Sequence, residues 1–154
     1  MIGIMFVCHG NICRSPMAQS VLTHLVRQAG LADSFIIESA ATSREEIGHD
    51  VHYGTKAKLR EKGIALVAHR AVQLTQKDYF DYDYLIGMDQ YNLRDMQRIA
   101  GGDPEKKLYR MLDFCGEAHD VADPWYTGDF EATYRDVRSG CEALLAFLKE
   151  QEAI

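Results

Sequence analysis

Residues 7–16 read VCHGNICRSP, and they join a run of apolar residues to a segment with helical periodicity. The run from Ile2 to Val7 lacks the polar alternation of a half-exposed strand, so it predicts a strand buried on both faces. Ser15 followed by Pro16 predicts a helix start with Ser15 as the N-cap, and Gly30 is suited to follow its end. The stretch therefore predicts a tight loop between a buried strand and a helix.

Apolar runs and helix-period segments alternate along the rest of the chain, which is typical of a parallel sheet covered by helices. We predict further strands at Phe35 to Glu38, near Ala65 to Ala68, at Tyr82 to Met88 and at Leu108 to Leu112. We predict further helices from about His52 to Lys62, from Asp89 to Ala100 and from Phe130 to Glu150. Without an internal repeat or linker, 154 residues fit one α/β domain, residues 1–154, with ligands at the carboxyl ends of the strands.

Composition and charge exclude several classes of function. Hydrophobic residues make up 47% and charged residues 26%, which is ordinary for a soluble globular protein. The net charge is -6 and no basic run is present, which argues against nucleic-acid binding. The N-terminal apolar run is too short for an export signal and no run is long enough to span a membrane. We expect a cytoplasmic protein that binds neither nucleic acid nor membranes.

The four cysteines do not form the pattern of a metal site or a disulfide framework. Cys8 and Cys13 would need a second closely spaced pair to hold zinc, and Cys115 and Cys141 lie too far apart to supply it. A structural disulfide is not expected in a chain of this size without an export signal. We therefore expect no metal and no cofactor.

The loop after the first strand has the composition of an anion-binding site. Gly10 and Asn11 tolerate the left-handed backbone angles that a tight curl needs. A curled loop at a helix N-terminus turns its N–H groups inward, and Arg14 could add a bidentate contact to two phosphate oxygens. Cys8 would lie at the floor as a thiolate nucleophile, with the Ser15 hydroxyl donating to its sulfur. The expected phosphate-binding loop comprises His9, Gly10, Asn11, Ile12, Cys13 and Ser15.

Phosphoryl transfer to sulfur also requires an acid for the leaving oxygen. The best candidate is Asp123, which lies in a polar loop and is followed by Pro124, a residue that stiffens the backbone. The neighbouring Trp125 and Tyr126 could hold a flat substrate. These residues predict the acid and one wall of a substrate cleft.

The pairing of CHGNICRS at residues 8–15 with DPWY at residues 123–126 resembles the low-molecular-weight protein tyrosine phosphatase family, in a spelling closest to its bacterial members. The resemblance extends over nearly the whole chain, including ESAATS at residues 38–43 and MDQYNLRDM at residues 88–96. It implies a four-stranded parallel sheet with helices on both faces and a phosphate-binding loop between the first strand and the first helix. It also implies hydrolysis of phosphotyrosine in a protein substrate, with inorganic phosphate as product.

The resemblance implies a role for each matching residue. Cys8 would be the nucleophile that becomes phosphocysteine, and Arg14 would bind the phosphoryl oxygens. Asp123 would protonate the tyrosyl oxygen and then act as base toward water. Cys13 would be a second thiol able to pair with Cys8 on oxidation.

Three further residues would support the loop according to the same resemblance. Asn11 would hold the loop through side-chain hydrogen bonds, with Ser39 and His69 as its supports. Asp89 would orient His69.

The chain departs from the family pattern at two places. The loop at residues 43–48 has no aromatic residue and carries Glu45 and Glu46, which we expect to form the opposite wall of the cleft and to favour basic neighbours in the substrate. Val72 stands where many members have an arginine that contributes to the supporting network.

Three other functions are open alternatives. A phosphoarginine phosphatase shares the fold, but that subgroup has threonine where this chain has Ile12, and a bulkier apolar side chain favours a tyrosyl ring. A thioredoxin-coupled arsenate reductase needs cysteines in the middle of the chain, and residues 79–93 contain none. The third is a phosphate-binding protein that senses redox state through Cys8 and Cys13. Phosphate binding without turnover needs neither a thiolate nor an acid, so Cys8 and Asp123 together argue against it, whereas redox sensing is compatible with phosphatase activity.

Overall fold

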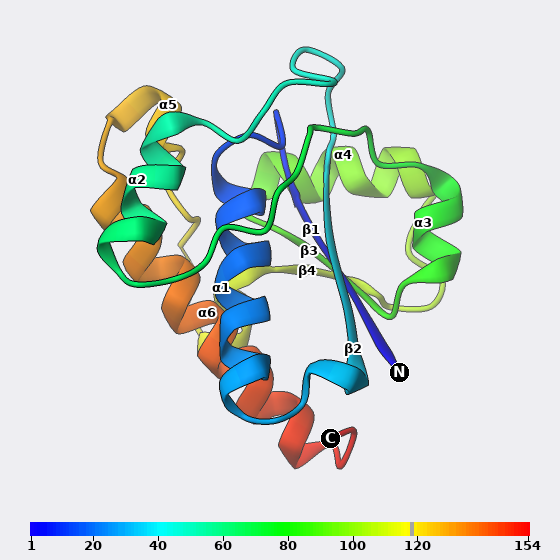
Figure 1. Cartoon of the computed structure of the whole chain (residues 1–154). Helices are drawn as coiled ribbons and strands as arrows, with labels where there is room; N and C mark the ends of the chain where they lie inside the picture. Colours follow the sequence, from blue (N-terminus) through cyan, green and yellow to red (C-terminus); the bar gives the residue numbers. More distant parts are fainter. Residues whose placement is uncertain (118) are drawn as a thin grey trace.

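The computed structural model describes residues 1–117 and 119–154, and its centre is a four-stranded parallel sheet (Figure 1). The strands are β1 (Ile2–Cys8), β2 (Phe35–Ala41), β3 (Tyr84–Gly87) and β4 (Leu108–Arg110). Their order across the sheet is β2-β1-β3-β4, so β1 is central. The predicted strands in these four regions are confirmed, and the carboxyl ends of β1, β2 and β3 meet at one edge.

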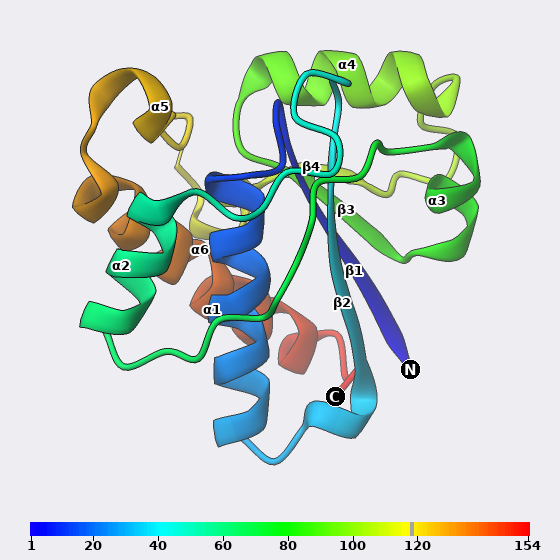
Figure 2. The same cartoon turned by 45° about the horizontal axis from the view of Figure 1, so that its top comes forward.

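Helices cover both faces of the sheet, which confirms the predicted fold class (Figures 1 and 2). Three helices lie on one face: α1 (Arg14–Gln28), α2 (Tyr53–Glu61) and α6 (Phe130–Glu150). Helix α1 packs on β1 and β2, and α2 packs against α1 and α6. The other face packs against α3 (Gln76–Asp81) and α4 (Gln90–Ala100). Short helices complete the described part of the chain: η1 (Ala32–Ser34), η2 (Met111–Cys115) and α5 (Pro124–Thr127).

Strand β1 has no solvent-facing side, because each face contributes to a separate half of the core. Ile4 and Phe6 pack in the half that includes α1 and α6, whereas Met5 and Val7 pack in the half that includes α4. All four side chains are buried. This explains why the strand is apolar throughout and lacks alternation. Within the described residues, no helix combines the length and apolar character needed to cross a membrane.

The prediction of a strand near residues 65–68 is wrong. This segment is irregular, and the backbone N–H of Val67 donates to the Ser20 hydroxyl of α1 instead of to a neighbouring strand. The helix α3 that follows was not predicted, although Thr75 and Asp78 form a capping box at its start.

The start of α1 also differs from the prediction. The helix begins at Arg14, and Cys13 occupies the N-cap position without a side-chain cap. Ser15 is therefore not the N-cap; it lies inside the first turn, where its hydroxyl contacts Cys8. Gly30 follows the helix end with a φ of 73°, as its position predicts.

Close packing of α6 against η2 gives a prediction about stability. A Cβ atom on Gly140 would lie 2.6 Å from Met111 Cγ and 3.1 Å from the Met111 carbonyl oxygen. We expect Gly140→Val to lower the free energy of unfolding by about 2–3 kcal/mol, because the two helices must move apart. Urea unfolding measures this change. Ser139→Val is the control on the exposed side of the same helix, and equal losses for both variants would contradict the packing argument.

Candidate active site

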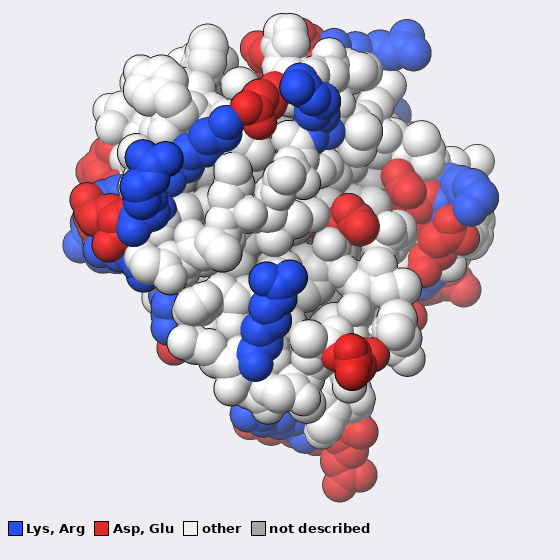
Figure 3. All heavy atoms as spheres, viewed as in Figure 1, with Lys and Arg blue, Asp and Glu red and all other residues white. Residues whose placement is uncertain are grey.

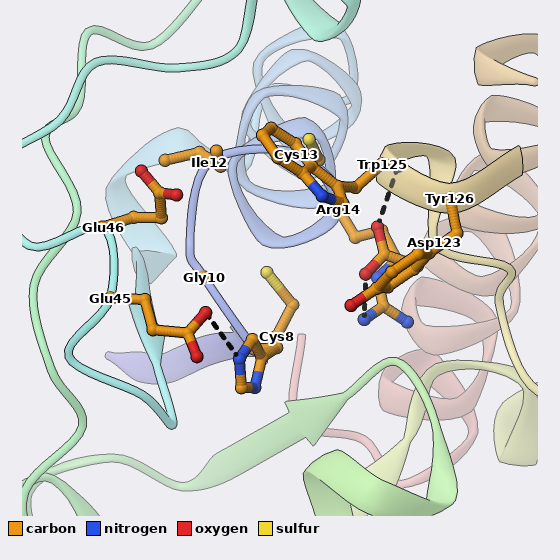
Figure 4. Close-up of a pocket in the computed structure, with 11 residues that line it drawn as sticks. Cys8, Gly10, Ile12, Cys13, Arg14, Glu45, Glu46, Asp123, Trp125 and Tyr126 are labelled. Atoms are coloured by element: carbon orange, nitrogen blue, oxygen red, sulfur yellow. Dashed lines mark hydrogen bonds and ion pairs between the residues drawn. The ribbon is translucent and has the colours of Figure 1, made fainter. Parts of the chain in front are cut away.

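A pocket opens at the carboxyl end of β1, where the loop of residues 9–13 leads into α1 (Figure 4). Asn11 has a φ of 59°, so this residue provides the left-handed turn. Gly10 tolerates such angles but does not adopt them, because its φ is not positive. Asparagine tolerates this conformation better than most residues. The curl of the loop therefore depends on one asparagine.

The side chain of Asn11 is buried and makes four hydrogen bonds. Its Nδ2 donates to Ser15 Oγ at 2.7 Å and to Ser39 Oγ at 3.0 Å. Its Oδ1 accepts from His69 Nε2 at 2.6 Å and from the backbone N–H of Val72 at 3.1 Å. Burial lowers the pKa of His69, so the neutral ring that donates from Nε2 is favoured.

The same network determines which atoms point at Cys8. The Ser15 hydroxyl accepts from Asn11, so its own hydrogen is free for Cys8 Sγ, 3.0 Å away. The backbone N–H of Asn11 also donates to Cys8 Sγ, at 3.2 Å. Two donors therefore converge on a sulfur that lies at the floor of the pocket.

Arg14 is buried beside this sulfur and is held mainly by one nitrogen. Its NH1 donates to Asp89 Oδ2 at 2.8 Å and to the Val121 carbonyl at 2.9 Å, whereas NH2 lies 3.4 Å from Asp123 Oδ2. Burial opposes the charge of Arg14, but the nearby Cys8, Asp123 and Asp89 outweigh it and raise the pKa of the guanidinium. Arg14 is cationic at any physiological pH.

Asp89 has a different partner from the one expected. One of its oxygens accepts from Arg14, and the other caps α4 by accepting from the backbone N–H of Asn92 at 2.7 Å. His69 contacts Asn11 instead. The expectation that Asp89 orients His69 is therefore wrong, and Asp89 orients the arginine.

Asp123 caps the short helix α5 and is exposed to the pocket on one side. Its Oδ1 accepts from the backbone N–H of Trp125 at 3.0 Å, and its Oδ2 faces Arg14 (Figure 4). The carboxyl group is about one quarter exposed, at 25%. One oxygen is thus fixed by the backbone while the other can be offered to a bound molecule.

The segment before Asp123 is anchored at three successive residues. Asp120 Oδ1 accepts from the backbone N–H of Gln90 at 3.1 Å and from Arg110 NH1 at 3.2 Å. The Val121 N–H donates to the Met88 carbonyl at 2.9 Å, and the Ala122 carbonyl accepts from Thr133 Oγ1 at 3.0 Å. These contacts bring a segment more than a hundred residues away in sequence to the loop after β1.

The opposite wall of the pocket is acidic and comes from the segment after β2. Glu45 and Glu46 lie on this side of the pocket (Figure 4). Glu45 Oε2 lies 3.1 Å from His9 Nε2, and Glu46 contacts His49. The pocket therefore combines residues from three segments of the chain: Cys8, His9, Gly10, Ile12, Cys13, Arg14, Glu45, Glu46, Asp123, Trp125 and Tyr126.

The remaining cysteines differ from Cys8 in their surroundings. Burial, together with the nearby Cys8 and Asp123, raises the pKa of Cys13 to about 12. Cys115 and Cys141 do not line the pocket, and Cys141 is fully buried among the apolar residues of α6. Within residues 1–117 and 119–154, no cluster of three or more His, Cys, Asp or Glu side chains could hold a metal ion.

Several supporting residues were missed by the sequence analysis. Gln19 accepts the Ser39 hydroxyl at 2.5 Å, and Thr55 Oγ1 donates to the Cys13 carbonyl at 3.0 Å. Asp120, Arg110 and Thr133 hold the segment before Asp123. None of these residues belongs to a local motif, so no pattern along the chain distinguishes them from surface polar residues.

Comparison with known proteins agrees with this geometry. The family model described as low molecular weight phosphotyrosine protein phosphatase matches residues 3–153, and the chain belongs to this family. The prediction that it is an enzyme of the phosphatase class is thereby confirmed.

The chain is similar to proteins from several organisms. It is 37% identical to the low molecular weight protein-tyrosine-phosphatase YfkJ of Bacillus subtilis, over all of both chains. The crystal structure of YfkJ superposes with a TM-score of 0.94, covering 98% of this chain and 96% of that one. A Drosophila arginine phosphatase superposes with a TM-score of 0.86 at 28% identity, covering 95% and 97% of the two chains.

Proposed function

We propose that the protein hydrolyses phosphotyrosine in protein substrates through a phosphocysteine intermediate on Cys8. The observation that carries this proposal is the position of Cys8 Sγ. It accepts from Ser15 and from the backbone of Asn11 at the floor of a pocket that also contains Asp123. A thiolate nucleophile and a separate carboxylic acid in one pocket are the groups that phosphoryl transfer to sulfur requires.

The phosphoryl group would bind in the loop above Cys8. The N-terminus of α1 provides backbone N–H groups and a favourable dipole for an anion. Arg14 NH1 is already bound by Asp89 and Val121, so NH2 is the nitrogen available for a phosphoryl oxygen. The contact between Arg14 NH2 and Asp123 Oδ2 is long, at 3.4 Å. If NH2 turned to a phosphoryl oxygen, this Asp123 oxygen would be free to face the substrate.

Two displacements then complete the reaction. In the first, the Cys8 thiolate forms a bond to phosphorus, the bond from phosphorus to the tyrosyl oxygen breaks, and Asp123 gives that oxygen its proton. In the second, Asp123 takes a proton from water as the water oxygen bonds to phosphorus and the sulfur–phosphorus bond breaks. Cys8 is regenerated and inorganic phosphate is released.

Substitution of the nucleophile and of the acid should have different effects. We expect Cys8→Ser to abolish turnover while phosphate still binds, because the loop and Arg14 remain. Asp123→Ala should slow substrates with poor leaving groups by about 10²–10⁴-fold and affect activated aryl phosphates much less. Steady-state kinetics over a series of aryl phosphates of graded leaving-group pKa measures this difference. A loss that is independent of the leaving group would mean that Asp123 is not the acid.

The choice of phosphotyrosine over phosphoarginine rests on Ile12, which lines the pocket with an apolar side chain. We expect kcat/KM for phosphotyrosine peptides to exceed that for matched phosphoarginine and phosphoserine peptides by about tenfold or more. Ile12→Thr should reduce the ratio of kcat/KM for phosphotyrosine peptides to kcat/KM for phosphoarginine peptides. A wild-type enzyme that prefers phosphoarginine would reverse the assignment of substrate.

The acidic wall formed by Glu45 and Glu46 should favour basic residues next to the phosphotyrosine, because opposite charges attract across the cleft. The same peptide series with Lys or Glu neighbours tests this part of the proposal. The double variant Glu45→Gln/Glu46→Gln should reduce the preference for Lys-containing peptides. An unchanged ranking would exclude a role for the wall.

Oxidation is expected to join Cys8 and Cys13. Peroxide converts a reactive thiolate to a sulfenic acid, which a second thiolate can attack to form a disulfide as hydroxide leaves. Because the pKa of Cys13 is raised to about 12, its thiolate fraction increases about tenfold per pH unit over the neutral range. Disulfide formation should therefore become faster as pH rises from 7 to 9.

Peroxide treatment followed by a thiol measures this protection. Wild type should recover activity through the Cys8–Cys13 disulfide, and Cys13→Ser should lose activity irreversibly as Cys8 oxidises further. If both proteins recover equally and mass mapping finds no Cys8–Cys13 link, Cys13 has no protective role.

A further inference from the structure

Exposed aromatic side chains are concentrated beside the mouth of the pocket. Trp125 and Tyr126 of α5 are 58% and 82% exposed, and Tyr53, the first residue of α2, is 80% exposed. Large aromatic side chains are normally covered, so a group of exposed ones indicates a contact surface. The surface above α5 on the face seen in Figure 3 carries no charged side chains.

Tyr53 is connected to the pocket through a continuous series of rings. The His52 ring stacks on Tyr53 at 4.4 Å and on Phe130 at 5.3 Å, and it meets the edge of Trp125 at 5.8 Å. Trp125 in turn lines the pocket. We refer to His52, Tyr53, Trp125 and Phe130 as the aromatic ledge.

Backbone contacts hold the ledge in position. The His52 N–H donates to the Ile12 carbonyl of the loop at 2.8 Å, and His52 Nδ1 accepts from the Gly54 N–H at 3.0 Å. A Cβ atom on Gly54 would lie 2.3 Å from Phe130 Cζ, so only glycine lets this ring pack so closely. The ledge is therefore formed before any substrate arrives, which limits the entropy lost on binding.

We propose that the aromatic ledge binds an aromatic or large aliphatic side chain of the substrate protein, near the phosphotyrosine in sequence. This inference rests on the proposed function, because it places the phosphotyrosine itself in the pocket. The ring centroids of Trp125 and His52 are 5.8 Å apart, and those of His52 and Tyr53 are 4.4 Å apart. An extended substrate chain covers such distances in about one to three residues. Together with the acidic wall on the other side, the ledge defines a substrate with an apolar neighbour on one side and a basic neighbour on the other.

The substrate is the occupant that the geometry favours, because Trp125 belongs to both the pocket and the ledge. A chain that places its phosphotyrosine over Cys8 must pass over one of the two walls. Contact between aromatic side chains adds a modest free energy for each pair. The ledge should therefore change the ranking of peptides without changing the chemical step.

The test compares Tyr53→Ala with wild type on three kinds of substrate: phosphotyrosine peptides with Phe or Leu at one of the three positions on either side, the same peptides with Ser there, and 4-nitrophenyl phosphate. We expect Tyr53→Ala to lower kcat/KM about 3–10-fold for the peptides with Phe or Leu and to leave the other two substrates unchanged. Tyr53→Phe should behave like wild type, because the ring and not the hydroxyl makes the contact. Phe80→Ala is the matched control, since Phe80 is an exposed aromatic residue on α3, away from α2 and α5 in Figures 1 and 2.

Several outcomes would overturn the inference. An equal loss on all three substrates would show that Tyr53 acts on the pocket itself, and no loss on any peptide would show that the ledge is not used. If sedimentation velocity shows a dimer that Tyr53→Ala dissociates while peptide ranking stays the same, the ledge binds a second copy of this chain. Failure of the proposed function looks different, because wild type would then turn over phosphotyrosine peptides no faster than matched phosphoarginine peptides, whichever residue stands at position 53.

Discussion

The site depends on the four hydrogen bonds of the buried Asn11 side chain. A left-handed residue in a loop costs free energy, and here the surrounding contacts maintain it. The same side chain orients Ser15 toward Cys8 and connects the loop to β2 through Ser39 and to the segment after α2 through His69. Because a buried amide that loses a partner is destabilising, the network favours one conformation of the loop over alternatives.

The N-terminus of α4 organises the other half of the site. Asp89 caps this helix and fixes Arg14, and the next residue, Gln90, donates its backbone N–H to Asp120. The N-terminus of α4 thus fixes the position of Arg14 beside Cys8 and the position of the segment that carries Asp123. The arrangement uses the edge of a parallel sheet where strand ends converge, which is where ligands bind in such folds. It explains how residues 8 and 123 come to share one pocket.

Local patterns predicted much of this architecture and failed where tertiary contacts decide. The apolar run of β1 and the long apolar stripe of α6 were read correctly, because each is buried in the way its periodicity indicates. The strand expected near residues 65–68 was wrong because its backbone pairs with a side chain of α1. The N-cap assigned to Ser15 was wrong because the helix begins at Arg14, so Ser15 lies inside the first turn and its hydroxyl contacts Cys8.

The sequence by itself determined the class of fold and the loop between β1 and α1, and it supplied the candidates for nucleophile, arginine clamp and acid. These depend on residue type and short-range spacing, which the chain shows directly. Only the tertiary structure decided that Asp89 holds Arg14 and not His69, that Asp120 anchors the segment before Asp123, and that His52 joins Tyr53 to the pocket. Each of these contacts joins residues that are far apart in the chain or depends on the direction of a side chain, and neither property has a signature in local sequence.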